Sequence, residues 1–174
     1  MPTRFLTLRD EHRELQAGLE VLRIAADAVG EAPLYQVRAL VARAVEFLTG
    51  ELLPRADAEE RGLYPVVARL IGAPEATQTM AEDHLEVARL TVELEVLHAG
   101  IGRTRLPPAA AQELRRILYG LYALIAAHLG KEEKVFFPLV EGRLSRIEAS
   151  RMLRAMRQFE WYSRDVRAVM QQAG

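Results

Sequence analysis

The chain has no cysteine, which excludes disulfides, iron–sulfur clusters and zinc sites built from thiolates. Aromatic side chains make up only 6% of its 174 residues, so the aromatic residues that favour β-strands are few. A formal net charge of −1 provides no excess of positive charge for binding nucleic acid or an anionic membrane. No stretch of 18 uninterrupted apolar residues is present, and the first residues lack the apolar run of a signal peptide. We therefore expect a cytoplasmic protein without nucleic-acid or membrane partners.

Apolar residues are abundant and are spaced as in amphipathic helices. The most frequent residue types, Leu, Ala, Arg and Glu, all favour helix. A first apolar stripe runs from Phe5 to Val29 in steps of three and four residues, and three similar stripes follow it. Short links between four such helices favour an up-down-up-down arrangement. We predict a single all-α domain over residues 1–174, with a four-helix bundle over about 4–140 and an additional C-terminal helix over about 145–172.

Proline and a capping motif predict where helices begin and end. Pro54 lies inside the second helix and should kink it, and Pro65 should close it. Pro138 lies near the predicted end of the fourth helix. The segment from Ser145 to Glu148 has the spacing of a capping box and should open the C-terminal helix.

Two segments of the chain are near copies of each other. Residues 59–65 (Glu-Glu-Arg-Gly-Leu-Tyr-Pro) match residues 132–138 (Glu-Glu-Lys-Val-Phe-Phe-Pro) at an offset of 132 − 59 = 73. Four residues before the leading glutamate, the first copy has Arg55 and the second copy has His128. The chain therefore resembles a duplicated helical hairpin in which Arg55 stands where the symmetry asks for a histidine.

Repeated histidines and glutamates fall in the apolar register of their helices. His12 and His84 (84 − 12 = 72) lie early in the first and third helices, whereas Glu59, His128 and Glu132 lie late in the second and fourth. Antiparallel packing brings all five to the same end of the bundle. An unpaired polar group buried there costs roughly 1–3 kcal/mol, and imidazole together with carboxylate suits Fe, Zn or Mn. We predict these five side chains as ligands of one or two metal ions.

The order and spacing of these elements resemble those of the hemerythrin-like HHE cation-binding family. The resemblance rests on His12 and on residues 53–65, 80–84 and 128–138, and it spans about residues 5–140. It implies a four-helix bundle that holds a non-haem di-iron centre between its helices. It also implies binding of dioxygen or nitric oxide, sensing of redox state or of iron, or a part in stress responses.

Two positions depart from the family pattern. Arg55 stands where the family has the histidine of the second helix, and arginine cannot lose its proton to become a ligand. Met80 stands one turn before His84, where the oxygen-carrying hemerythrins have another histidine, and a thioether is a poor ligand for iron. These departures argue against a reversible oxygen carrier.

Arg55 itself allows two interpretations. In the first, its guanidinium pairs with Glu59 or Glu132 and replaces one metal ion electrostatically, which leaves a single ion in the site. In the second, Glu51 turns inward as a replacement ligand while Arg55 extends toward solvent, which restores a site for two ions.

Three functions are compatible with this pattern. The leading one is an iron-binding protein that senses or binds oxygen, nitric oxide or redox state, rather than an enzyme. In the second, the bundle holds no metal and acts as an interaction or regulatory module, with Arg55 in a buried ion network. The third is a ferroxidase or a peroxide-handling enzyme with open metal positions.

The remaining polar and aromatic residues have simpler interpretations. We expect His98 to be structural, the second glutamate of each doublet (Glu60 and Glu133) to be solvated, and Tyr64 to serve packing. Apolar residues of the C-terminal helix, including Met152, Met156, Phe159, Val166 and Met170, form either bundle core or the contact of a homodimer.

Overall fold

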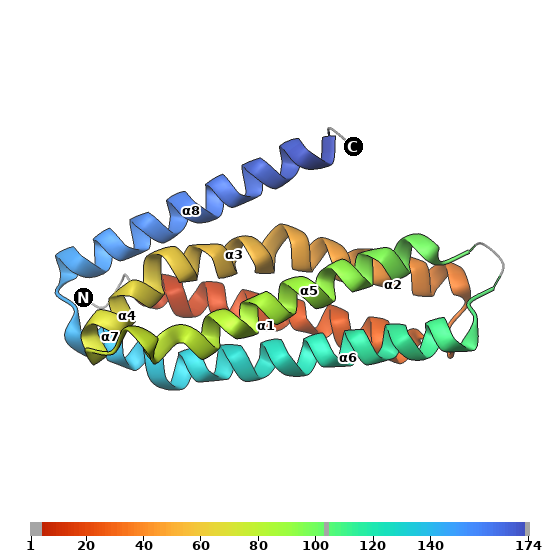
Figure 1. Ribbon diagram of the computed structural model, residues 1–174, viewed down its shortest axis with the longest axis horizontal. Helices are drawn as coiled ribbons and strands as arrows, with labels where there is room; N and C mark the ends of the chain where they lie inside the picture. The colour runs from red at the N-terminus through yellow and green to blue at the C-terminus, as the bar shows by residue number, and fades with distance from the viewer. Residues whose placement is uncertain (1–4, 103–104, 173–174) are drawn as a thin grey trace.

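A computed structural model describes residues 5–102 and 105–172, and it contains helices and no strand over those residues. Four long helical segments form a bundle, and a further helix lies obliquely against it (Figure 1). The segments are, in order, α1 (Phe5–Ala28); α2 (Leu34–Phe47), η1 (Leu48–Leu52), α3 (Leu53–Ala58), η2 (Glu59–Leu63) and α4 (Tyr64–Ile71); η3 (Pro74–Thr77) and α5 (Gln78–Gly100); α6 (Pro108–Lys131), η4 (Glu132–Phe136) and α7 (Phe137–Arg143); and α8 (Arg146–Gln172).

The packing of the long helices follows their order in the chain. α1 contacts α2 and α6, and α5 also contacts α2 and α6, so each helix neighbours the ones before and after it. Gly30 and Gly72 follow the first and second segments with φ angles of 89° and 79°, a left-handed conformation that glycine adopts without strain. The predicted all-α four-helix bundle with an additional C-terminal helix is confirmed. None of the described helices is long and apolar enough to cross a membrane.

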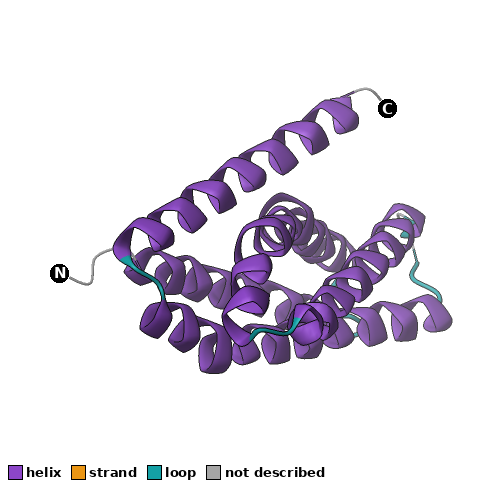
Figure 2. Ribbon diagram, turned by 60° about the vertical axis from the view of Figure 1, so that its left-hand side comes forward, coloured by secondary structure: helices purple, strands orange, loops and turns teal. Residues whose placement is uncertain are grey.

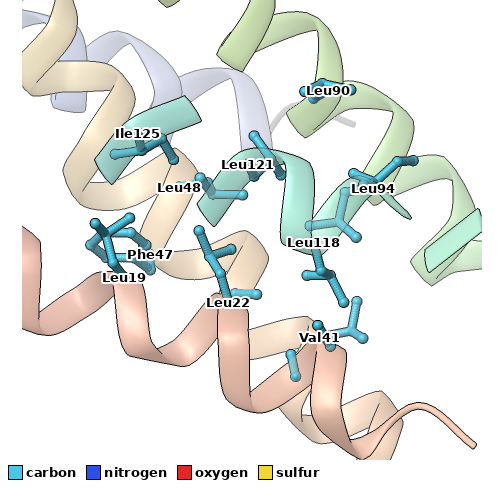
Figure 3. Close-up of a cluster of buried hydrophobic side chains, with 14 of the residues drawn as sticks. Leu19, Leu22, Val41, Phe47, Leu48, Leu90, Leu94, Leu118, Leu121 and Ile125 are labelled. Atoms are coloured by element: carbon cyan, nitrogen blue, oxygen red, sulfur yellow. The ribbon is translucent and has the colours of Figure 1, made fainter. Parts of the chain in front are cut away.

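Two apolar clusters fill the bundle. The larger one gathers side chains from all four long segments, among them Leu22, Val41, Leu94 and Leu118 (Figure 3). The smaller one lies toward the end where α4, α7 and the start of α8 meet, and it includes Phe137. Burial of this apolar surface supplies the main stabilisation of the fold. The clusters are separate, and the layer between them is polar.

The predicted helix end at Pro65 is wrong, because helical structure continues to Ile71. Pro138 lies near the end of its segment, which continues to Arg143. In a regular α-helix the proline ring would clash with the carbonyl four residues earlier. A π turn directly precedes each of these prolines, and another precedes Pro54. The wider turn accommodates the ring. The residue before each proline donates its backbone N–H to a carbonyl five residues earlier: Leu53 to Leu48, Tyr64 to Glu59 and Phe137 to Glu132.

The first half of α8 packs on α3 and η2. The predicted capping box is present: the backbone N–H of Ser145 donates to Glu148 Oε2 at 2.9 Å, and the backbone N–H of Glu148 donates to Ser145 Oγ at 3.3 Å. Met152 and Met156 are buried and Phe159 is partly buried, as predicted for bundle core. Val166 is 38% exposed, so the core contact ends before it, and the side chain of Met170 lies outside the described part.

Close packing of α8 depends on Gly62. A Cβ atom at this position would lie 2.4 Å from Met156 Cγ and 3.2 Å from the Met156 backbone nitrogen. In the second copy of the repeat the equivalent residue is Val135, which is 53% exposed. α8 therefore covers only the first copy, and glycine there is explained by the close approach of the helix.

We predict that Gly62→Ala lowers the free energy of unfolding by roughly 1–3 kcal/mol, because the added methyl overpacks the contact with Met156. Gly130→Ala is the matched control, since a Cβ atom at this helical position meets nothing within 4 Å. It should raise stability by about 0.5–1 kcal/mol through the better helix propensity of alanine. Urea denaturation of both variants measures the difference, and equal stabilities would contradict the contact.

Candidate metal centre

A layer of buried polar side chains separates the two apolar clusters. Its members come from all four long segments, and each is at most 8% exposed. They are His12, Arg55, Glu59, His84, His128 and Glu132. Ionisable groups removed from water at this depth are stable only if they are paired, bonded to hydrogen-bond partners or bound to metal. The structure thus brings the five predicted ligands and Arg55 together.

The π turns carry the glutamate doublets. Glu59 is the first residue of η2 and Glu132 is the first residue of η4, and both point into the layer. The second glutamates are not simply solvated, which corrects the expectation for Glu60 and Glu133. Glu60 Oε1 lies 2.9 Å from His84 Nδ1, and Glu133 Oε1 lies 3.3 Å from the Nδ1 atom of the first histidine, His12.

A carboxylate holds the outer nitrogen of every histidine in the layer. Asp83 Oδ2 lies 3.2 Å from His128 Nδ1 and completes the set. Because an ionised carboxylate only accepts hydrogen bonds, each Nδ1 carries the proton. Each Nε2 therefore faces inward with its lone pair, unless the imidazole is doubly protonated. Metal-binding histidines are oriented by carboxylates in this same way.

His84 and His128 form the first candidate position. Their Nε2 atoms are 2.9 Å apart, although both face inward as acceptors. Two lone pairs at this distance repel each other, so a metal ion or a shared proton between the two nitrogens stabilises the arrangement. Adjacent ligands about 2.1 Å from one ion are about 3 Å apart, which matches the observed separation. Burial, followed by the nearby His84, lowers the pKa of His128, so protonation of that imidazole is disfavoured.

Glutamates complete this position. Glu59, His84 and His128 offer ligand atoms that all lie within 4.8 Å of one another. Glu59 Oε2 is 3.6 Å from His84 Nε2, and Glu132 Oε1 is 3.8 Å from His128 Nε2. The donor set is two imidazoles with one or two carboxylates, which suits a divalent first-row metal.

His12, Glu59 and Glu132 form a second group whose ligand atoms also lie within 4.8 Å of one another. His12 Nε2 is 2.9 Å from Glu132 Oε2, so both nitrogens of this imidazole face carboxylates. Burial lowers the pKa of His12, but the hydrogen bond and charge of Glu132, with smaller contributions from Glu59 and Glu133, outweigh burial and raise it. A protonated His12 therefore satisfies this group without metal.

Arg55 points into the same region. Its Nε donates to Glu59 Oε1 at 2.8 Å, its Nη1 pairs with Glu11, and Glu160 of α8 lies 4.0 Å from Nη1. Burial lowers the pKa of Arg55, but the charges of Glu59 and Glu11 outweigh it, so the guanidinium stays positive. Glu51 is exposed and belongs to neither candidate group. The structure therefore does not bring Glu51 to the site, and Arg55 occupies the inward position.

Tyr64 is a polar member of the site that the sequence analysis assigned to packing. Its hydroxyl donates to Glu132 Oε1 at 3.1 Å and lies 3.2 Å from His128 Nε2 and 3.3 Å from His84 Nε2. Burial raises the pKa of Tyr64, so the phenol is neutral. The repeat contained a sign of this role. Tyr64 aligns with Phe137 of the second copy, so only the first copy has a hydroxyl at this ring. Phe137 packs edge-on against His12 at 4.8 Å between ring centroids.

The other two sequence-derived positions lie away from the ligands. Met80 is buried in the smaller apolar cluster, and His98 is half-buried near the end of α5. Neither belongs to the candidate ligand groups among the described residues.

A cavity of about 20 Å³ adjoins the first candidate position. This volume accommodates about one water-sized molecule. Its polar lining consists of Arg55, Glu59, His84 and His128, and its remaining walls are apolar side chains such as Leu15 and Ile125. The cavity therefore offers space for a small ligand beside the imidazoles and little else.

Comparison with known proteins agrees with this geometry. Residues 5–140 match the model of the hemerythrin HHE cation-binding domain. No curated protein and no solved structure shows a significant match to the chain. The family match covers all four bundle helices and every ligand candidate described above, and the chain belongs to the hemerythrin HHE cation-binding domain family.

Proposed function

We propose that this protein binds one iron ion at the position formed by Glu59, His84 and His128, with Glu132 and Tyr64 beside it. The observation that carries the proposal is the 2.9 Å separation of the two inward-facing Nε2 atoms. We propose iron because the chain belongs to a cation-binding family and because two imidazoles with carboxylates suit this metal, although the same donors bind zinc and manganese.

The charges in the layer support one ion rather than two. At the other position, the guanidinium of Arg55 lies against Glu59 and a protonated His12 lies against Glu132. The fixed charge of Arg55 and the proton held by His12 compensate the two carboxylates that a second ion would need. A second ion would also be repelled by Arg55, which cannot lose its proton. This is the electrostatic replacement that the sequence suggested.

The bound ion would serve to sense or bind dioxygen, nitric oxide or redox state. Iron supplies an open coordination position and reversible one-electron chemistry. The protein limits the ligand to a few atoms through the size of the cavity, and its apolar walls exclude bulk water. Glu60 and Asp83 hold the imidazoles of His84 and His128 in place, so the site is formed before the ligand arrives.

A metal-free module is the second candidate, and one observation favours it. Arg55 pairs with Glu59 and Glu11 without any metal, so the negative charge of Glu59, one of the two buried glutamates, is already compensated. In that case a chelator would leave the melting temperature unchanged. If iron binds only to the native state, the melting temperature instead rises with the concentration of free iron.

We predict that the protein purified after reconstitution with ferrous iron contains one equivalent of iron per chain, measured by elemental analysis. His84→Ala and His128→Ala should each reduce bound iron to background, because each removes one of the two facing nitrogens. His98→Ala is the matched control and should keep one equivalent. Two equivalents in the unmodified protein would refute a single-ion site.

We also predict that Arg55→His raises the content to two equivalents per chain, because it replaces the fixed charge by a neutral ligand facing Glu59. Absorption spectroscopy of the oxidised variant should then show the charge-transfer bands of a bridged iron pair. A variant that stays at one equivalent would show that the missing histidine is not what limits the second ion.

Arg55→Met should destabilise the metal-free protein by roughly 3–5 kcal/mol, because it leaves Glu59 buried without its partner. Arg61→Met is the matched control, since Arg61 also pairs with a carboxylate four residues away, but its side chain is 54% exposed. That change should cost less than about 1 kcal/mol. Chemical denaturation in chelator compares the two, and equal losses would contradict the buried role of Arg55.

A further inference from the structure

The outward side of α8 carries exposed aromatic and charged residues that no contact within the chain explains. We define the outer face of α8 by its exposed residues Arg154, Gln158, Trp161, Tyr162 and Asp165. Trp161 is 68% exposed and Tyr162 is 58% exposed. Aromatic residues with charged neighbours are typical of protein interfaces, where their large surfaces become buried.

This face is directed away from the bundle. Met152, Leu153 and Met156 are buried on the opposite side of the helix, and α8 contacts α3 and η2. The C-terminal half of α8 extends away from the other helices in both views (Figure 2). The outer face is therefore open to a partner from Arg154 to Asp165, about three turns of helix.

The order of residues on this face is self-complementary. Positions 154, 158, 161 and 165 follow one another at steps of four, three and four, which is the spacing of an apolar or mixed seam between two helices. Arg154 and Asp165 lie at equal distances from the midpoint of this segment, and so do Gln158 and Trp161. In an antiparallel pair related by a two-fold axis through this midpoint, each residue of one copy meets the residue at the same distance on the other side of the midpoint in the second copy.

We propose that a second copy of this chain docks antiparallel on the outer face of α8. Arg154 of one copy then faces Asp165 of the other, twice across the axis, and Gln158 faces Trp161. Neither Arg154 nor Asp165 has an ion-pair partner among the described residues, so both charges are available. The amide of Gln158 offers an acceptor to the indole N–H of Trp161.

Charge selects this occupant over others. An acidic segment would suit Arg154 and the neighbouring Arg157 but would be repelled by Asp165. A basic segment would have the reverse problem. The partner must present both charges in the opposite order along a helix, and α8 of a second copy does so.

A groove beside the outer face gives room for the aromatic side chains. It has a volume of about 840 Å³, and its walls include Arg61, Arg157, Phe159 and Trp161. The cation of Arg61 lies over the ring of Phe159, 5.6 Å from its centroid, which keeps this wall in place.

The size of the contact sets the expected strength. One helix pair buries less than the roughly 1,600 Å² of a standard stable interface. We therefore expect a dimer with a dissociation constant on the order of micromolar, whose subunits exchange readily between dimers.

Sedimentation velocity of the full-length chain across the micromolar range tests the proposal. Arg154→Asp and Asp165→Arg should each weaken the dimer at least about tenfold, because each places like charges opposite one another. The double variant that carries both changes should restore it, since it exchanges the two charges. Trp161→Ala should abolish it. Arg38→Asp, at an exposed arginine of α2, is the control and should leave the dimer unchanged.

All of these positions are exposed, so circular dichroism should show unchanged helix content and melting. A chain that stays monomeric at every concentration overturns the proposal. A dimer that the double variant fails to restore overturns the antiparallel pairing. A monomer that binds a polyglutamate probe through Arg154 and Arg157 would assign the face to an acidic partner instead, which also overturns it.

Discussion

The structure depends on the compensation of charge in a layer that lies between two apolar clusters. Glu59 and Glu132 are essentially buried, so their ionised forms persist only beside positive charge. Two groups of the chain supply it, the guanidinium of Arg55 and the imidazole of His12, and the facing nitrogens of the other histidines offer a position for a cation. The bundle helices can pack around this layer only because each carboxylate has such a partner within reach.

α8 covers the first copy of the repeat and leaves the second copy exposed, and the two copies differ in sequence accordingly. Where the second copy has His128 and an exposed Val135, the first copy has Arg55 and Gly62. Gly62 lets α8 approach, and α8 in turn brings Glu160 to within 4.0 Å of Arg55 Nη1. Arg55, which stands where the repeat has a histidine, is therefore in contact with the covering helix. Glu160 also pairs with Arg164 of the same helix at 2.7 Å, so the contact with Arg55 adds to an existing ion pair.

Apolar periodicity predicted the bundle, and the spacing of the histidines and glutamates predicted which side chains meet, because both follow from helical geometry alone. The π turns were not predictable in this way. Pro65 was interpreted as a helix end, whereas one added residue in the preceding turn lets the helix continue. The same turns direct Glu60 toward His84, which apolar register does not encode. Tyr64 directly follows the same π turn, so the direction of its hydroxyl toward the histidines also depends on the local turn and could not be predicted from the residue type.

A fixed cation and an exchangeable cation have different consequences for the fold. The charge of Arg55 depends on neither pH nor metal supply, so Glu59 keeps a positive partner whether or not a metal is bound. The facing imidazoles of His84 and His128 have no such fixed charge beside them. Under the proposed function, the cation at this position is exchangeable while Arg55 is not. A site for two exchangeable ions would make the compensation of both buried glutamates depend on metal supply, whereas Arg55 makes the compensation of Glu59 independent of it.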